Sequence, residues 1–438
     1  DVPAHLYNII LGGPTDSAIT LSVLAHQAMD GFFTYGMKPD TLTNKTPVLQ
    51  WKAGEAIELD IKNLKPNTRY YYKFNYQLAG TNPTTSASAT FHTQRATGST
   101  FVFTVQADSH LDFGTNPAVY ERTLKNALTD RTDFHVALGD TFMTGKYVDH
   151  RKAYPHYLAQ RYYFGRLCHS ASLFFVLGNH DGESLRYWDG TANNPAAWSA
   201  NLRKELLPNP SPNGFYTGNS QPQQHIGLLE DYYAWEWGDG LFVTLDPFWF
   251  TQRTRGKGDN WNWTLGKTQY DWLASTLENS KNKYKFIFIH HLLGGVDRSQ
   301  RGGKAAAAFF EWGGRNLDGQ SEFAVKRPGW AKPIHDLLVQ HNVSIVFHGH
   351  DHLYAKEELD GITYQCVPQP SHSRGGIRDA AEYGYKDGVI LGSSGHIRVT
   401  VSPVAAKVDY VKSILPGAES NGRKNGMTAH SYNINSKQ

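Results

Sequence analysis

The sequence is poor in cysteine, in net charge and in long hydrophobic runs, and each shortage excludes a class of protein. Two cysteines, Cys168 and Cys366, are too few for a disulfide framework or a zinc cluster held by thiolates. Lysine and arginine number 43 against 40 acidic residues, so no broad basic surface is available to bind long nucleic acid. No apolar run approaches the roughly 18 residues of a membrane-spanning helix, so no transmembrane segment is expected.

Histidine, by contrast, is abundant. The chain has 20 histidines in 438 residues, which is a first indication of metal binding.

Hydrophobic residues make up 40% and charged residues 19%, a composition typical of folded protein. At roughly 150 residues per domain the length suggests two or three domains. Two buried thiols are favoured for the cysteines, although a bridge stays open because pairing cannot be read from sequence.

Export from a bacterial cell is expected, to the periplasm, the cell surface or the medium. The low cysteine content, the 13% of aromatic residues and the loops rich in Asn and Thr favour it. The chain begins at Asp1 without a Met, which suits either a mature exported protein or a trimmed one. The oligomeric state stays open.

Residues 1–97 have the pattern of an all-β domain. Apolar and polar residues alternate over Ile19–Val23, Ile57–Ile61 and Tyr70–Phe74, as in half-buried strands. Turn residues separate these runs, and short strands at this spacing indicate a small β-sandwich. The stretch Leu64–Tyr72 resembles the tyrosine corner of fibronectin type III-like domains, in which a Tyr hydrogen-bonds back to the preceding loop. We expect this domain to serve mainly as a packing partner, with a binding role for its exposed aromatic residues as the alternative.

From residue 98 to 412 strands alternate with helices, which indicates βαβ units and a largely parallel sheet. Short apolar runs predict six strands, at Phe101–Gln106, Phe134–Leu138, Leu173–Leu177, Leu241–Leu245, Lys285–Ile289 and Ser344–Phe347. Asn116 and Pro117 predict the start of one helix, Thr264 is expected to cap a second, and Pro333 opens a third. The segments 182–238 and 294–329 are too irregular for core elements and are expected to frame a site. Residues 413–438 are expected to form a C-terminal tail.

Polar clusters follow five of these strands. They are Asp108-Ser109-His110, Gly139-Asp140, Gly178-Asn179-His180-Asp181, His290-His291 and His348-Gly349-His350-Asp351-His352. Ligands bind at the carboxyl ends of strands in open α/β sheets, so we expect the clusters to converge. Asp, His and Asn suit zinc, iron or manganese. Counting one side chain per expected ligand gives seven. Seven is too many for one tetrahedral ion but suits two ions that share a carboxylate. Two such ions form a clamp for in-line displacement at phosphorus.

The motifs D-x-H, G-D, G-N-H-D, H and G-H-x-H, in this order, resemble those of the calcineurin-like metallophosphoesterase superfamily. The resemblance covers roughly residues 100–412. With the preceding β domain, the chain is most similar to bacterial exported phosphoesterases of the purple-acid-phosphatase-like group. The resemblance implies an α/β fold, a βαβ sandwich of two mixed sheets flanked by helices, preceded by a small all-β sandwich domain.

The resemblance also implies a role for each polar residue. It assigns Asp108, His110 and His352 to one metal ion. It assigns Asn179, His290 and His350 to the other, and Asp140 would bridge the two ions. His290 is preferred to His291 as the metal ligand because the family's ligand directly follows the strand. The alternative for His291 is a position that supports the ligands without contacting the metal. His180 resembles the histidine that protonates the leaving group or steadies the transition state. Asp181 is expected to orient loops or His180 rather than bind metal.

Two departures from the family bear on the metals and the substrate. Met143 stands where purple acid phosphatases have the tyrosine that binds ferric iron. We therefore expect a colourless centre with two divalent or mixed-valence ions of manganese, zinc or iron. The histidines that the plant enzymes carry after the fourth-strand ligand are replaced by a segment containing Arg298. Arg298 and His291 are the candidates for binding substrate, with a solvated basic loop as the alternative for Arg298.

The sequence thus predicts a dinuclear metal-dependent hydrolase of small phosphate esters, in which a metal-bound hydroxide attacks phosphorus in line. Phosphomonoesterases of the acid-phosphatase type are the leading class. A phosphodiesterase or nucleotidase acting on small nucleotides or phospholipid head groups is the alternative, since the long inserts could enclose a second organic group. A non-catalytic cell-surface binding protein is the alternative from another class, and it predicts the loss of a ligand or of His180, neither of which is lost.

Overall fold

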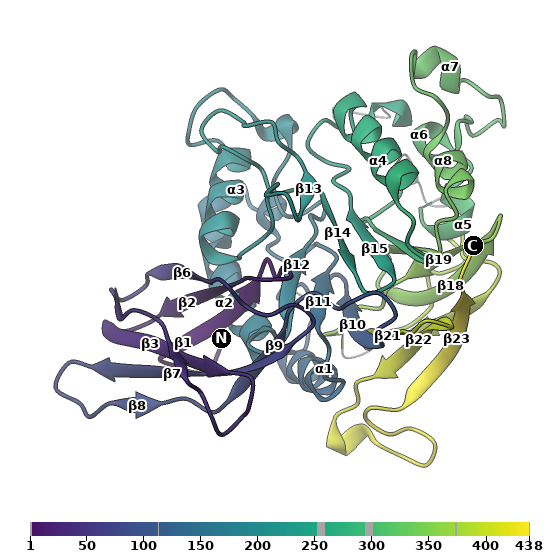
Figure 1. Cartoon of the computed structure of the whole chain (residues 1–438). Helices are drawn as coiled ribbons and strands as arrows, with labels where there is room; N and C mark the ends of the chain where they lie inside the picture. Colours follow the sequence, from purple (N-terminus) through teal and green to yellow (C-terminus); the bar gives the residue numbers. More distant parts are fainter. Residues whose placement is uncertain (1, 113, 252–258, 294–300, 373–374, 438) are drawn as a thin grey trace.

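The computed structural model describes residues 2–112, 114–251, 259–293, 301–372 and 375–437. Figure 1 shows an N-terminal β region, in purple and blue, lying against a larger α/β region. Strands of the α/β region form two sheets, and helices cover their outer faces. None of the helices in the described part of the chain is long and apolar enough to cross a membrane.

Two antiparallel sheets form the N-terminal region and enclose one hydrophobic core that contains Phe33, Trp51 and Phe74. The first sheet has the order β1 (Tyr7–Gly12), β2 (Ile19–Ala25), β6 (Ala56–Ile61). The second is built on β3 (Met29–Gly36) and β7 (Arg69–Leu78), with the short strands β4 (Asn44–Lys45), β5 (Leu49–Trp51), β8 (Thr84–Thr85) and β9 (Ala89–His92). The three strands predicted from alternation lie within β2, β6 and β7, which confirms the all-β prediction.

The start of β7 is fixed by a tyrosine. The hydroxyl of Tyr70 accepts a hydrogen bond from the backbone N–H of Lys65 at 2.8 Å. This is the bond back to the preceding loop that the sequence led us to expect. Because the ring of Tyr70 also stacks on Phe91 of β9, with centroids 5.3 Å apart, it ties the loop to the core of the region.

The α/β region has two mixed sheets. One has the order β12-β11-β10-β21-β22-β23 and the other β13-β14-β15-β16-β17-β19-β18-β20. The strands of the first sheet are β10 (Phe101–Gln106), β11 (Phe134–Ala137), β12 (Ser172–Phe175), β21 (Gly395–Val401), β22 (Ala405–Lys412) and β23 (Thr428–Asn435). Those of the second are β13 (Thr217–Gly218), β14 (Tyr233–Trp237), β15 (Gly240–Thr244), β16 (Tyr284–Phe288), β17 (Ile345–His348), β18 (Leu353–Leu359), β19 (Ile362–Cys366) and β20 (Val389–Gly392). Within each sheet, one run of neighbouring strands is parallel, β10 to β12 in the first and β15, β16, β17 and β19 in the second.

Aromatic side chains fill the space between the two sheets. Phe103 of β10 stacks on Phe134 of β11 with centroids 5.3 Å apart. It also meets Phe242 of β15 at 5.2 Å and Phe286 of β16 at 5.3 Å, both edge to face. All four side chains are fully buried. Rings of this size dominate core energetics, so this layer holds the two sheets together.

Helices cover the outer faces. The longer helices are α1 (Pro117–Thr129), α2 (Tyr154–Cys168), α3 (Pro195–Leu206), α4 (Lys267–Asn279) and α8 (Ile334–Gln340), and the short ones α5 (Gly303–Ala306), α6 (Phe310–Gly313) and α7 (Phe323–Lys326). α1 and α2 pack on β11 and β12, and α4 and α8 pack on β15 and β16. As predicted, Asn116 caps α1, and its side chain accepts hydrogen bonds from the N–H groups of Ala118 and Val119.

The prediction did not include the five strands β18 to β22, and three further features differ from it. Thr264 does not cap α4: the helix begins at Lys267, after Gly266 with φ of 77°, and the Thr264 hydroxyl accepts from the N–H of Gly266 instead. The segment 182–238 was expected to lack core elements, but it contains the buried strand β14. Within the predicted C-terminal tail, β23 pairs with β22 along its length and extends the sheet (Figure 1). Both cysteines are buried free thiols, as favoured.

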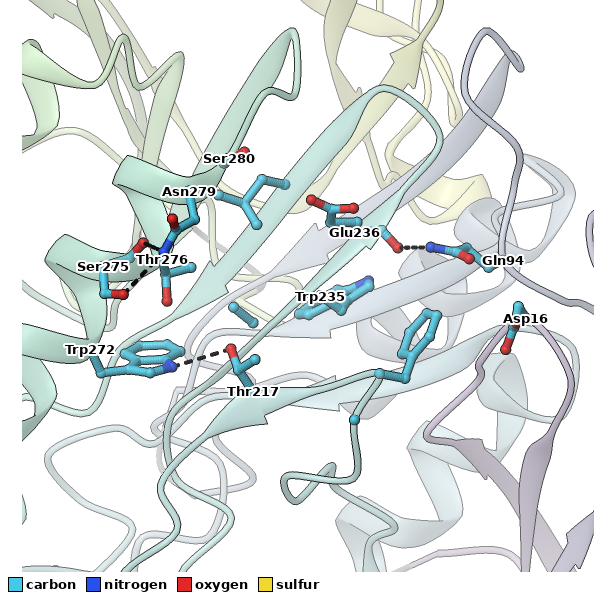
Figure 2. Close-up of a pocket in the computed structure, with 14 residues that line it drawn as sticks. Asp16, Gln94, Thr217, Trp235, Glu236, Trp272, Ser275, Thr276, Asn279 and Ser280 are labelled. Carbon is cyan, nitrogen blue, oxygen red and sulfur yellow. Dashed lines mark hydrogen bonds between the residues drawn. The ribbon is translucent and has the colours of Figure 1, made fainter.

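The two regions are joined by polar contacts along a seam. The buried guanidinium of Arg161 in α2 donates to Asn8 Oδ1 at 2.7 Å and to Ser22 of β2, and also to the Leu206 carbonyl. Figure 2 shows a second link, in which the Gln94 amide donates to the carbonyl of Glu236 in β14 at 2.9 Å. These bonds fix the β region against the α/β region.

Candidate metal centre

The carboxyl ends of the parallel strands meet at one edge of the α/β region. Asp108 and Asp140 follow β10 and β11, His290 follows β16, and His350 and His352 follow β17. Four of these residues adopt left-handed backbone conformations, with φ of 56° at Asp108, 52° at Asp140, 75° at His350 and 57° at His352. Such conformations are unfavourable for residues other than glycine and cluster at functional sites. The turns after the strands are therefore shaped to present these side chains.

The first group of ligand-type side chains is Asp108, His110 and His352. One ligand atom from each lies within 4.8 Å of the others. The Oδ1 atom of Asp108 is 3.4 Å from Nε2 of His352 and 3.9 Å from Nε2 of His110. The second carboxylate oxygen, Oδ2, accepts the N–H of His350 at 2.7 Å. This bond fixes the carboxylate so that Oδ1 faces the two imidazoles.

The second group is Asp140, His290 and His350, whose ligand atoms also lie within 4.8 Å of one another. Nε2 of His290 is 3.3 Å from Asp140 Oδ2 and 3.0 Å from Asn179 Oδ1. It is also 3.9 Å from Asp108 Oδ1, so the two groups adjoin. The structure therefore brings all seven residues that the sequence singled out as metal ligands to one place.

The donor atoms fit a pair of cations. Asp108 Oδ1 and His110 Nε2 are buried and have no hydrogen-bond partner among the described residues. Buried polar atoms without partners are rare and call for an explanation such as an ion. Burial alone would lower the pKa of His290, but Asp140 and Asp108 outweigh it and raise the pKa to about 10. The carboxylates thus favour positive charge at this position, and Asp, His and Asn are ligands that zinc, iron and manganese accept.

Asp181 organises the loops that carry Asp140 and Asn179. Its buried carboxylate accepts four backbone N–H groups, from Asp140 at 3.1 Å, Thr141 and Phe142 at 2.8 Å and Gly178 at 2.7 Å. A Cβ atom at Gly178 would lie 2.0 Å from the Asp140 nitrogen, so only glycine allows the two loops to approach this closely. Asp181 therefore orients loops, as the sequence predicted.

The predicted catalytic histidine lies on the same loops. His180 is half-buried, and its backbone N–H donates to Asp140 Oδ1 at 2.8 Å. Burial lowers the pKa of its imidazole below the ordinary histidine value, although Asp140 acts in the opposite direction. The lowered pKa favours the neutral imidazole at neutral pH.

The two predicted substrate residues differ in position. His291 is buried against Phe248 and Trp263, with ring centroids 5.0 and 4.9 Å away, and lies 5.0 Å from the ring of His350. Burial and the neighbouring His290 lower its pKa to about 3, so it is a neutral imidazole behind the ligands. Its role in binding substrate stays a prediction. Arg298 lies outside the described residues.

The sequence did not reveal the residues that support the ligands from outside. Asp112 lies 3.2 Å from Nδ1 of His110, and Lys146 donates to Asp112 at 2.6 Å. Asp351, between two ligand histidines, is held by Arg301 at 2.5 Å and by the Tyr385 hydroxyl at 2.6 Å. The bond of Asp112 fixes the orientation of the His110 ring, and Arg301 also donates to the His350 carbonyl at 3.2 Å. Asp351 lies within the last motif and Asp112 lies two residues after the first, which was the available signal, whereas their partners are distant in sequence.

Comparisons with known proteins agree with this arrangement. Residues 101–354 match the family model described as calcineurin-like phosphoesterase. The fold is similar to a solved structure described as PhoD, with a TM-score of 0.68, 15% identity, and coverage of 98% of this chain and 90% of that chain. It is also similar to the purple acid phosphatase PPD1 from yellow lupin (Lupinus luteus) seeds, with a TM-score of 0.61, 15% identity, and coverage of 98% and 74%.

None of the curated proteins compared matches this sequence. At 15% identity the two structural similarities establish the fold alone. The family model, however, spans more than half of the chain and contains the strands and loops that carry all seven candidate ligands. The chain belongs to the calcineurin-like phosphoesterase family and is a hydrolase of phosphate-ester bonds.

Proposed function

We propose that the protein is a dinuclear metal-dependent phosphomonoesterase of the acid-phosphatase type that acts on small phosphate esters. The observation that carries the proposal is the adjoining of two ligand groups, Asp108 with His110 and His352, and Asp140 with His290 and His350. The similarity to a purple acid phosphatase supports monoester hydrolysis over the diesterase or nucleotidase alternative. Family membership and the complete set of ligands oppose the non-catalytic alternative.

In this proposal each group of three holds one ion, Asn179 adds a ligand to the second group, and Asp140 bridges the two. Two bound divalent cations supply charge that stabilises phosphoryl oxygens and lowers the pKa of a water molecule, the chemistry of in-line displacement at phosphorus. Manganese, zinc and iron are the candidate metals, because the ligands are imidazole and carboxylate groups. Asp181 and the left-handed turns keep the loops in place for these ligands.

His180 is the proposed proton donor to the leaving group. Its imidazole lies on the loop that also carries Asn179, and its backbone bond to Asp140 fixes the loop beside the proposed bridging carboxylate. It is half-buried, so part of the residue is exposed. A positioned general acid of this kind contributes roughly 10²–10⁴-fold in rate.

The test is turnover of para-nitrophenyl phosphate and bis-para-nitrophenyl phosphate by protein loaded with manganese, zinc or iron. The proposal predicts preferential hydrolysis of the monoester, loss of activity on chelation and recovery when metal is restored. Asp149→Asn is a matched control for ligand variants, because Asp149 is an exposed carboxylate that pairs with Arg151. Preferential hydrolysis of the diester would favour the phosphodiesterase alternative, and activity that resists chelation would contradict the metal dependence.

The place of action is a separate part of the proposal. Export from a bacterial cell rests on composition, namely the low cysteine content and the aromatic content. Fractionation of the source cells would test it, since the proposal predicts phosphatase activity outside the cytoplasm.

A further inference from the structure

A pocket of about 320 Å³ lies on the seam between the β region and the α/β region. Arg69, Tyr71 and Thr90 line it from the β region, and Leu128, Arg131 and Ser170 from the α/β region. Arg131 precedes β11 and Ser170 precedes β12, so the pocket lies toward the amino ends of these strands. The metal centre lies at the carboxyl ends of the same strands, and the pocket is therefore a separate feature.

The pocket carries an unbalanced positive charge. The guanidinium groups of Arg69 and Arg95 pair with one buried carboxylate, that of Asp133. The guanidinium of Arg131 lies close enough to Arg69 for its like charge to act on it. Arg95 already pairs with Asp133 through two bonds, at 2.8 and 3.0 Å, whereas Arg69 is 3.5 Å away. Bidentate pairing of this kind is the stronger arrangement. The charge of Asp133 is thus matched mainly by Arg95.

Arg131 has no counter-charge of its own. In the part of the chain that the structure describes, its exposed guanidinium makes no hydrogen bond or ion pair. The neighbouring Asp130 is turned away and pairs with His396 at 2.7 Å and Arg398 at 2.8 Å. Burial lowers the pKa of Arg69, and the like charges of Arg95 and Arg131 lower it further. The negative charge of Asp133 acts in the opposite direction and raises it.

The remaining polar groups of the pocket are hydroxyls, which can donate to an anion. The Arg69 side chain is held in place by a bond to the Thr90 hydroxyl at 3.3 Å. Ser170 lies beside it, since its hydroxyl accepts from the Thr90 N–H at 3.2 Å and shares a hydrogen bond with Nδ1 of His169 at 2.8 Å. Two guanidinium groups with hydroxyl donors are a pattern that matches the oxygens of phosphate.

A second pocket on the same seam provides a contrast. The pocket in Figure 2 has a volume of about 480 Å³ and is lined by Asp16, Gln94 and Glu236 together with aromatic and hydroxyl side chains. Its described lining includes two carboxylates and no Lys, Arg or His. An anion would be repelled there, so positive charge is a property of the smaller pocket and not of the whole seam.

We propose that the smaller pocket binds a phosphate-type oxyanion, held by Arg69 and Arg131 with the hydroxyl of Tyr71 as a further donor. Inorganic phosphate, a product of phosphomonoester hydrolysis, is the simplest such ligand. Because the donors come from both regions, the bound anion links the β region to the α/β region. The pocket does not depend on the proposed function, since none of its residues is in the metal centre.

The test is equilibrium dialysis of radiolabelled inorganic phosphate against the metal-loaded protein and three variants: Arg131→Gln, Asp140→Asn and the two together. The expected result is two sites in the wild type, one in each single variant and none in the double variant. Arg131→Gln should also abolish the rise in melting temperature that phosphate gives to the Asp140→Asn protein, while leaving turnover of para-nitrophenyl phosphate unchanged.

Arg151→Gln serves as the control, because Arg151 is an exposed arginine that lies outside the pocket. Arg69→Gln should weaken phosphate binding by about tenfold or more, as Arg131→Gln does, because each removes a charge-assisted bond. Equal phosphate binding by the wild type and Arg131→Gln would overturn the inference. If instead the proposed function is wrong, Asp140→Asn should bind as much phosphate as the wild type, while Arg131→Gln still binds less. The two outcomes are therefore distinguishable.

Discussion

The Nε2 atom of His290 lies 3.3 Å from Oδ2 of Asp140, across the space between the two sheets. The other ring nitrogen, Nδ1, bonds to the Leu138 carbonyl at 2.6 Å. With Nδ1 as the donor, Nε2 is the atom left to bind a cation. The adjacent His291 instead bonds to the backbone carbonyl of Leu292 and packs against Phe248. Two neighbouring histidines thus have different environments.

His290→Ala should therefore remove a metal ligand, whereas His291→Ala should not. We expect His290→Ala to bind about one ion fewer per chain and to lose roughly 100-fold or more in kcat. His291→Ala should keep two ions and lose mainly stability, because it leaves a cavity in a buried cluster. Metal analysis of the two purified variants measures this difference. Two ions in His290→Ala and one in His291→Ala would reverse the assignment.

The metal-loaded protein should show no purple absorption band from a tyrosine bound to iron. Met143 occupies the position of that tyrosine and is fully buried. The nearby Tyr147 directs its hydroxyl to His156 Nε2 at 2.6 Å, so it is already paired. A visible spectrum of the iron-loaded protein tests this expectation. A band that disappears in Tyr147→Phe would contradict it, and Tyr154→Phe, at an exposed tyrosine, is the control.

The candidate site could be predicted from sequence because its ligands directly follow strands. Asp108, Asp140 and His290 come one or two residues after short apolar runs, so a local pattern was enough to place them. The supporting pairs could not be predicted, since Arg301 and Asp351, or Arg69 and Asp133, meet only in the folded chain. The type of a residue and its neighbours in sequence do not indicate which distant residue it will pair with.

The errors in the fold have similar causes. β14 has the sequence Tyr-Ala-Trp-Glu-Trp, whose mixture of ring and polar residues looked irregular, although all but Glu236 are buried. β23 is an edge strand that alternates between exposed and half-buried residues, and such strands have little hydrophobic signal. Thr264 has the residue type of a helix cap, but Gly266 determines where α4 begins.

His180→Ala should keep both ions but lose roughly 10²–10⁴-fold in rate on alkyl phosphates, the range expected for a positioned general acid. The loss should be much smaller with para-nitrophenyl phosphate, because para-nitrophenolate is a weak base and leaves without a proton. Steady-state kinetics on both substrates measure the difference. An equal loss on both would assign His180 to stabilising the phosphoryl oxygens, and unchanged rates would remove it from the mechanism.

Arg161→Ala should destabilise the protein by about 2–4 kcal/mol, because it leaves buried acceptors of both regions without a donor. The guanidinium is fully buried and donates to Asn8, Ser22 and Leu206. Urea unfolding followed by tryptophan fluorescence measures the change. Arg151→Ala is the control, since the Arg151 side chain is 72% exposed and should alter stability by less than about 0.5 kcal/mol. A similar loss in both variants would refute the structural role of Arg161.

The most direct test of the dinuclear centre is the metal content of the wild type and of Asp140→Asn, measured by mass spectrometry on protein purified with manganese, zinc or iron. Asp140 is the proposed shared ligand, so its change should affect both sites at once. We predict two ions per chain in the wild type, and loss of both ions together with phosphatase activity in Asp140→Asn. Two ions and full turnover in Asp140→Asn would contradict the bridging role, and a single ion in the wild type would contradict the dinuclear centre itself.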